Sequence, residues 1–219
     1  ISSSQARARR ASCGSRSSRP ESGGSSSSLR AAPVRRRGVD VGAPCDTVPV
    51  AIDLKKTLDA YQAKRGLLRL VDVPPLQYLM VDGSGDPNTA ARFADAVTAL
   101  YPIAYALKFA GRERHGVDTV VMPLEGLWHA PDMDSFTTRR NKGDWLWTLM
   151  IMVPDHVDDE MFADAVAAAS RKKEPSPLLP EVRLERLSEG LCVQTLHIGP
   201  FDDEGPVLED LHHRFVPEN

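Results

Sequence analysis

The chain of 219 residues is poor in cysteine and in aromatic residues, and it lacks long apolar runs. Its three cysteines, Cys13, Cys45 and Cys192, are scattered. They provide neither the disulfide framework of a small secreted domain nor the spacing of a zinc site. No apolar stretch reaches the roughly 20 residues that a membrane-spanning helix requires. We therefore expect a soluble, cytoplasmic protein with no membrane partner.

Motifs for metal ions, phosphates and nucleophilic catalysis are absent as well. The adjacent residues His212 and His213 would point about 100° apart on a helix, so they cannot bind one metal ion together. Gly83-Ser84-Gly85 lacks the further glycine and the lysine of a phosphate-binding loop. No recognisable order of Ser, His and Asp indicates a catalytic triad. The sequence therefore predicts no metal site and no cofactor.

Charge is divided unevenly along the chain. Residues 1–40 contain nine arginines against Glu21 and Asp40, so this part carries about +7 and the remainder about −10. The acidic remainder offers no electrostatic footprint for DNA or RNA. We expect no nucleic-acid partner, and no feature of the sequence sets an oligomeric state.

Residues 1–45 consist mostly of Ser, Arg, Gly and Pro. Such a segment cannot bury enough apolar surface to offset the entropy of ordering it, so we predict that it is disordered. An organelle-targeting peptide is one alternative, because the segment is rich in Arg and Ser and poor in acids. An artefact of the reading frame is another, since the chain starts with Ile. We assign the folded domain to residues 52–219.

Hydrophobic periodicity predicts alternating strands and helices from residue 52 onward. In chain order, the predicted elements are an amphipathic segment at 53–61, strands at 67–73 and 76–81, a turn at 83–85, a helix at 87–111, strands at 119–124 and 145–153, a helix at 157–173, a hairpin of strands at 182–187 and 191–198, and a helix from about 204 capped by Asp202 or Asp203. Asp86 and Pro87 indicate the start of the long helix, and Pro102 should kink or break it. The strand at 145–153 is apolar on both faces, which predicts a central position in the sheet.

Four segments together resemble the GyrI-like small-molecule-binding family. They are Pro74–Asn88, Tyr101–Phe109, Pro123–Trp128 and His197–Pro206. The resemblance covers roughly residues 52–215 and includes stand-alone members related to cyclopropanoid cyclopropyl hydrolases. It implies an α+β fold, in which duplicated β-α-β-β units surround an antiparallel sheet backed by two helices.

The resemblance also implies a second unit that stops early in this sequence. Family members normally continue with two more strands, the first of which carries an acidic residue at the centre of the pocket. Here the sequence ends at Asn219, before such strands, which would leave the strand at 191–198 with an unpaired edge. We expect a fragment or a truncated gene model, with an impaired protein or a gap covered by another protomer as alternatives.

The function implied by the resemblance is binding of a hydrophobic, planar or cationic small molecule in an aromatic cleft. The ligand-binding residues would be Tyr78, Met80, Trp128, Trp147, His197 and Phe201. Glu125 is the candidate acid, because it follows an apolar strand and precedes Gly126-Leu127-Trp128. Burial among aromatic rings would disfavour its charged form and suit it to act as a general base.

Each of these residues also has a structural interpretation. Tryptophans in central strands are commonly core residues, Glu125 could be a solvated residue at a strand end, and His197 could hydrogen-bond at the edge of the sheet. The alternative function is a hydrolase that opens the cyclopropane ring of cyclopropanoid genotoxins. A third possibility is an interaction module that pairs its open strand with a partner.

Overall fold

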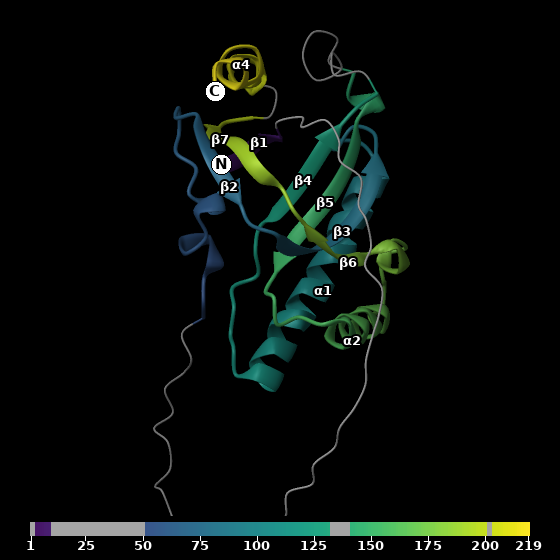
Figure 1. The fold of residues 1–219 in the computed structure, drawn as a ribbon. Helices are drawn as coiled ribbons and strands as arrows, with labels where there is room; N and C mark the ends of the chain where they lie inside the picture. The colour runs from purple at the N-terminus through teal and green to yellow at the C-terminus, as the bar shows by residue number, and fades with distance from the viewer. Residues whose placement is uncertain (1–2, 10–50, 132–140, 201–202) are drawn as a thin grey trace, which may run out of the picture. The chain divides into compact units, whose positions relative to one another are not determined.

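The computed structural model describes residues 3–9, 51–131, 141–200 and 203–219 (Figure 1). Residues 1–10 and 49–219 belong to one compact unit, and residues 11–48 belong to a second. The first unit contains all the described elements. None of its described helices has the length and apolar character needed to cross a membrane.

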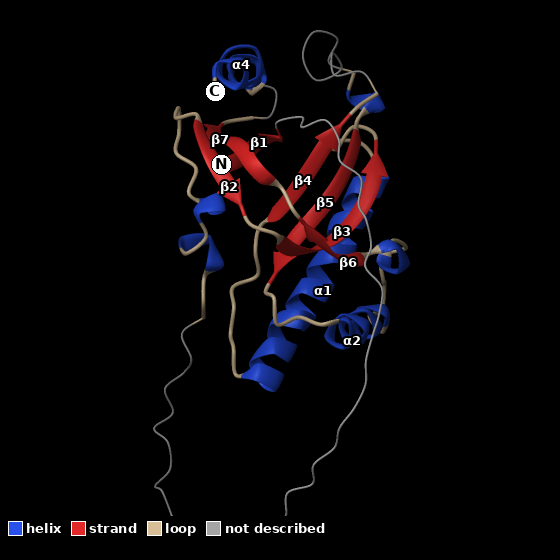
Figure 2. Ribbon diagram, viewed as in Figure 1, coloured by secondary structure: helices blue, strands red, loops and turns tan. Residues whose placement is uncertain are grey.

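The strands form two antiparallel sheets (Figure 2). The four-stranded sheet has the order β4 (Leu124–His129), β5 (Leu146–Val153), β3 (Leu76–Ser84) and β6 (Arg183–Leu187). The three-stranded sheet has the order β1 (Ser3–Arg9), β7 (Gly190–Ile198) and β2 (Arg69–Val73). The predicted α+β class is confirmed, and the strands are divided between two sheets.

Two long helices accompany the four-stranded sheet, and shorter helical segments complete the described unit. The helical elements are α1 (Ala91–His115), α2 (Asp159–Ser170), α3 (Gly205–Asp210), the π-helical segment Leu211–Phe215, α4 (Val216–Glu218), and the 3₁₀ turns Leu54–Lys56, Asp59–Tyr61, Lys142–Asp144 and Leu179–Glu181. Helix α1 packs along one face of the sheet, and α2 packs against α1. The carboxylate of Asp158 caps α2 by accepting a hydrogen bond from the Met161 backbone N–H at 2.8 Å.

Strand β5 lies inside its sheet, between β4 and β3, as its apolar sequence predicts. Every residue from Trp147 to Val153 is buried. Because both faces of this strand are covered, it carries apolar side chains at consecutive positions rather than in alternation. It therefore forms the centre of the core.

Helix α1 differs from its prediction at both ends, and Pro102 does not break it. Asp86 caps a turn instead of the helix, since its carboxylate accepts the Asn88 N–H at 2.9 Å and the helix begins only at Ala91. The helix passes through Pro102 without a break and ends at Gly116, whose φ of 67° closes it in the left-handed conformation. The residues around Pro102 that face the sheet are fully buried. Their burial outweighs the cost of about 3 kcal/mol that proline imposes in a helix interior.

The predictions of a strand at 119–124 and of a turn at 83–85 are wrong. Strand β4 begins at Leu124, directly after Pro123, which has no N–H to donate to a ladder. Thr119 makes only a single bridge, to Ile52. The predicted turn at 83–85 is replaced by strand, since β3 continues through Gly83 to Ser84. The ring of Trp147 in β5 packs over the bare backbone of Gly83.

The predicted hairpin of 182–187 and 191–198 does not form. Strand β6 pairs with β3, whereas β7 pairs with β1 and β2 in the other sheet. Gly190, the first residue of β7, adopts a φ of 67°, a conformation that glycine takes without steric cost. This bend sends the chain from one sheet into the other.

Strand β7 is paired on both sides, in contrast to the expectation for 191–198: β1 pairs along Cys192–Ile198 and β2 along Gly190–Gln194. Ser3–Arg9 therefore form a strand although the sequence predicts disorder for 1–45. Backbone pairing at a sheet edge needs no apolar side chains, which explains why the composition gives no sign of this strand. Residues 1–2 and 10–45 lie outside the described residues.

Candidate functional site

The register of the four-stranded sheet divides the predicted site residues between its two faces. Glu125 pairs with Met150, and Met150 pairs with Met80. Paired residues project to the same side, and so does Tyr78, which precedes Met80 by two positions. Glu125, Met150, Met80 and Tyr78 thus form one surface, which we call the Glu125 face.

Glu125 is the second residue of β4, an edge strand of its sheet, and it is half-buried. The hydroxyl of Tyr61 donates a hydrogen bond to its Oε1 atom. Tyr61 is buried and ends the 3₁₀ turn Asp59–Tyr61. A hydroxyl that donates to a carboxylate favours the charged form and opposes the effect of burial.

The remainder of the Glu125 face is apolar and densely packed around this carboxylate. Tyr78 is fully buried, and Met80 and Met150 are each 2% exposed. Methionine side chains are flexible and polarisable, so they adjust to ligands of different outline. The structure therefore brings together Glu125, Tyr78 and Met80 of the predicted set, and it adds Tyr61 and Met150.

A polar group lies at the other end of the Glu125 face, two residues beyond Met80. The Asp82 carboxylate accepts hydrogen bonds from the Thr148 hydroxyl at 2.6 Å and from the Arg183 guanidinium at 2.9 Å. Partial burial acts to raise the pKa of Asp82, but these two partners outweigh it and lower the pKa below its ordinary value. Because Tyr78, Met80 and Asp82 alternate along β3, the sequence alone could have placed Asp82 on the same face.

Trp128 and Trp147 lie on the opposite face, which packs against α1. They pair with each other across β4 and β5, and both contact Phe93 of α1 at ring-centroid distances of 6.3 and 5.3 Å. Trp147 is only 1% exposed, and its Nε1 donates a hydrogen bond to the Gly85 carbonyl oxygen at 3.2 Å. These contacts match the core interpretation of both tryptophans, and the structure does not bring them together with Glu125.

His197 lies in the other sheet. It belongs to β7, and its Nε2 is 3.1 Å from the Pro200 carbonyl oxygen. That contact is a local one, between residues three positions apart in the chain. Phe201 lies outside the described residues.

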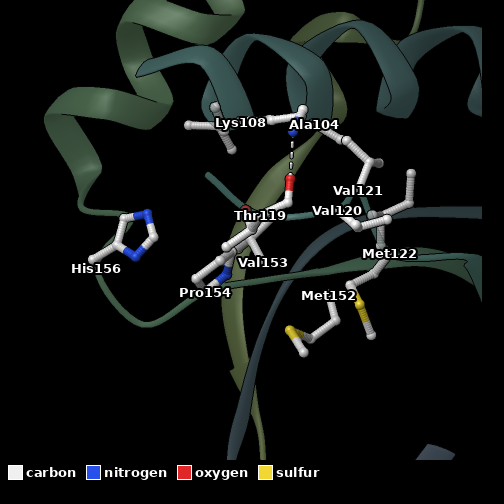
Figure 3. A pocket seen from close by; sticks show the side chains of 12 residues that line it. Ala104, Lys108, Thr119, Val120, Val121, Met122, Met152, Val153, Pro154 and His156 are labelled. Carbon is white, nitrogen blue, oxygen red and sulfur yellow. Dashed lines mark hydrogen bonds between the residues drawn. The ribbon is translucent and has the colours of Figure 1, made fainter. Parts of the chain in front are cut away.

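A small cavity opens where α1, the segment before β4 and the end of β5 meet (Figure 3). Lys108 crosses its rim and donates a hydrogen bond to the Thr119 carbonyl oxygen at 2.8 Å. The space inside, about 20 Å³, has room for about one water molecule and is far below the volume of a ligand pocket. None of the predicted site residues lines it. Within the described ranges, no group of three or more His, Cys, Asp or Glu could hold a metal ion.

Comparison with known proteins places the chain among solved structures from Listeria innocua. No protein-family model matches the sequence, and no curated protein matches it. An uncharacterized conserved protein of that organism is 34% identical, with a TM-score of 0.66, over 76% of this chain and 81% of its own.

Two structures described as hydrolases from Listeria innocua also match. One is 34% identical with a TM-score of 0.66 over 77% of this chain and 82% of its own. The other is 32% identical with a TM-score of 0.63 over 76% of this chain and 84% of its own. At this identity and coverage, the chain belongs to the same protein family as these Listeria innocua proteins.

Proposed function

We propose that this chain is a GyrI-like domain that binds a hydrophobic, planar or cationic small molecule on the Glu125 face. The observation that carries the proposal is the half-buried Glu125 carboxylate, which accepts a hydrogen bond from Tyr61 beside Met80 and Met150. A carboxylate next to adaptable apolar side chains attracts a flat cation through both its charge and its surface.

A ligand would reach the Glu125 face at Glu125 itself, because this residue lies in β4, an edge strand of the four-stranded sheet. Tyr78, Met80 and Met150 are buried, whereas Glu125 is half-buried in an edge strand. A ligand would therefore meet the carboxylate first and then displace the side chains that cover the methionines. His197 and Phe201 stay predictions from the resemblance, and the two tryptophans act through the packing of the sheet.

The test compares a cation with a neutral molecule of the same size. Proflavine is a planar aromatic cation, and anthracene-9-methanol is a neutral ring system of similar dimensions. Glu125→Gln keeps the shape of the side chain and removes its charge, so we expect proflavine to bind about tenfold more weakly, which corresponds to about 1.4 kcal/mol. Binding of the neutral compound should change less than about twofold.

Glu113→Gln is the matched control, because Glu113 is an exposed acid on α1. Fluorescence titration of the two compounds with wild type and both variants gives the dissociation constants. If proflavine binds Glu125→Gln as tightly as wild type, Glu125 does not hold the cation. If neither compound binds wild type, the Glu125 face is not a site for planar ligands.

Hydrolysis is the second candidate function, and the two relatives described as hydrolases favour it. For a cyclopropanoid substrate, Glu125 would take a proton from water while the water oxygen bonds to a ring carbon. The strained C–C bond breaks, its electron pair passes into the attached conjugated system, and that system takes up a proton. Strain in the ring supplies much of the driving force, so one positioned base would suffice.

This second function predicts a different result for the same variant. Glu125→Gln should retain its affinity for a neutral cyclopropanoid and lose turnover by about 10² to 10⁴-fold, the range for removal of a general base. Single-turnover analysis by mass spectrometry separates the two effects, since the product gains one water. Unchanged turnover would exclude Glu125 as the base.

A further inference from the structure

A polar side chain is completely buried in the middle of β7. Gln194 is 0% exposed. Its Nε2 donates a hydrogen bond to the Ala60 carbonyl oxygen at 2.5 Å, and its Oε1 accepts one from Nη2 of Arg69 at 2.7 Å. A polar side chain in such a place is costly unless it is hydrogen-bonded, and both ends of this amide are.

Ala60 belongs to the 3₁₀ turn Asp59–Tyr61, and Arg69 extends the network to the first residue of this turn. Its Nη1 donates to both carboxylate oxygens of Asp59, at 2.9 and 3.0 Å, and its Nη2 donates to the Asp59 carbonyl oxygen at 2.7 Å. Gln194 and Arg69 therefore hold the first two residues of the turn, Asp59 and Ala60. The third residue is Tyr61, whose hydroxyl donates to Glu125.

The network joins the two sheets at the candidate site. Gln194 lies in β7 and Arg69 in β2 of the three-stranded sheet, whereas Glu125 lies in β4 of the four-stranded sheet. The turn that carries Tyr61 is short and has no side-chain cap of its own. Its position is therefore set by these outside contacts, because a 3₁₀ turn of three residues has few hydrogen bonds to hold it.

We propose that Gln194 is a positioning residue, which fixes the Asp59–Tyr61 turn so that the Tyr61 hydroxyl lies on the Glu125 carboxylate. The inference rests on the proposed function only in taking Glu125 as the ligand-binding acid. Glutamine suits this role because it presents a donor to Ala60 and an acceptor to Arg69 from one side chain. The three-stranded sheet thereby positions a hydrogen-bond donor for an acid in the other sheet.

The test follows Glu125 and Tyr61 directly, by NMR of protein labelled with ¹³C at the Glu side-chain carboxyl carbon and at the Tyr Cζ. Tyr61→Phe removes a hydrogen bond to the charged carboxylate, so we expect the titration midpoint of Glu125 to rise by about one pH unit. Gln194→Met should raise it in the same direction and shift the Tyr61 Cζ signal. The double variant should move the midpoint no further than Tyr61→Phe alone.

Three further variants make the result decisive. Thr195→Val is the matched control, since Thr195 is the next buried polar residue of β7, and it should leave both signals unchanged. Gln194→Glu keeps the volume but loses the Nε2 donor, and should resemble Gln194→Met. Asp59→Asn loosens the Arg69 contact at the surface without disturbing the core, and should give a smaller shift of the same sign.

The possible results separate this inference from the proposed function. If the folded Gln194 variants and Asp59→Asn leave the Tyr61 signal and the Glu125 midpoint as in wild type, while Tyr61→Phe moves the midpoint, Gln194 does not position Tyr61. If Gln194→Met fails to fold, Gln194→Glu and Asp59→Asn decide the matter by the same two signals. If proflavine binds Glu125→Gln as tightly as wild type, the proposed function fails. The Tyr61 signal and the Glu125 midpoint still report whether Gln194 positions the turn.

Discussion

Replacing Gly83 by alanine tests the packing that places the tryptophans in the core. A Cβ atom at position 83 would lie 2.0 Å from one ring carbon of Trp147 and 2.4 Å from two others. The ring cannot move away easily, because it is buried, contacts Phe93 at 5.3 Å and is hydrogen-bonded to Gly85. Overpacking a core costs about 1–3 kcal/mol, and a rigid ring at this distance belongs at the upper end of that range.

We therefore expect Gly83→Ala to lower the free energy of unfolding by about 3 kcal/mol. With a urea m-value of about 2 kcal/mol/M, the midpoint of urea unfolding falls by about 1.5 M. Trp147→Phe removes the ring atoms that meet the new Cβ, so the double variant should be more stable than the sum of the two single effects predicts. Tryptophan fluorescence and far-UV circular dichroism during urea unfolding measure both quantities.

Gly205→Ala is the control, since nothing lies within 4 Å of a Cβ built there and the residue is helical. Alanine should change the free energy of unfolding by less than about 1 kcal/mol at this position, because the backbone entropy that it saves is opposed by the steric cost of a helical Cβ before Pro206. The argument is refuted if Gly83→Ala unfolds at the same urea concentration as wild type, because Trp147 would then be free to move. A mobile Trp147 would support its interpretation as a ligand-binding residue.

Two further predictions concern α2 and its contact with α1. Asp158→Ala removes the cap on the Met161 N–H and should lower the free energy of unfolding, measured in urea, by about 1 kcal/mol. Asp159→Ala removes no cap and should lower it by less. Equal losses in the two variants would contradict the capping role of Asp158. Burial, followed by the nearby His115, lowers the pKa of His156 below its ordinary value of 6.5. The unfolded chain then binds this proton more readily, so wild type should lose stability relative to His156→Gln as the pH falls below about 6.5, and parallel pH profiles would contradict this.

Local pattern in the sequence was sufficient for elements whose signal is contained within a few residues. The continuous apolar run of β5 predicted its central position, and hydrophobic periodicity predicted the helix that the structure has as α2. Pro74 and Pro75 correctly separated β2 from β3. In each case the determining contacts lie within the element or directly beside it.

Strand pairing depended on contacts that local pattern does not contain. Gly190 indicated a change of direction, but a turn signal does not say which sheet edge receives the next strand. The pairing of β1 with β7 uses backbone groups alone, so a segment with little apolar character forms a strand. The error at 119–124 had a local cause instead, because Pro123 moves the start of the ladder to Leu124.

The candidate site was predictable where strand alternation applies and not beyond it. Alternation placed Tyr78 and Met80 on one face, which the register confirms, and Glu125 joins them through Met150. The partner of Glu125 was out of reach of the sequence, since Tyr61 lies 64 positions away and contacts it only after the two sheets assemble. Chemistry that depends on such a pair requires the fold.

The two faces of the four-stranded sheet therefore have different physical roles. On the α1 face, Trp128, Trp147 and Phe93 contribute large buried area and fixed ring contacts, so substitutions there should change the free energy of unfolding. On the other face, flexible methionines surround an acid that holds a hydrogen bond from a separately anchored turn. Substitutions at Glu125 should change ligand binding at little cost in stability, because a half-buried carboxylate contributes less packing than a buried ring. The α1 face thus contributes stability alone, whereas the Glu125 face combines the candidate chemistry at Glu125 with the buried core residues Tyr78, Met80 and Met150.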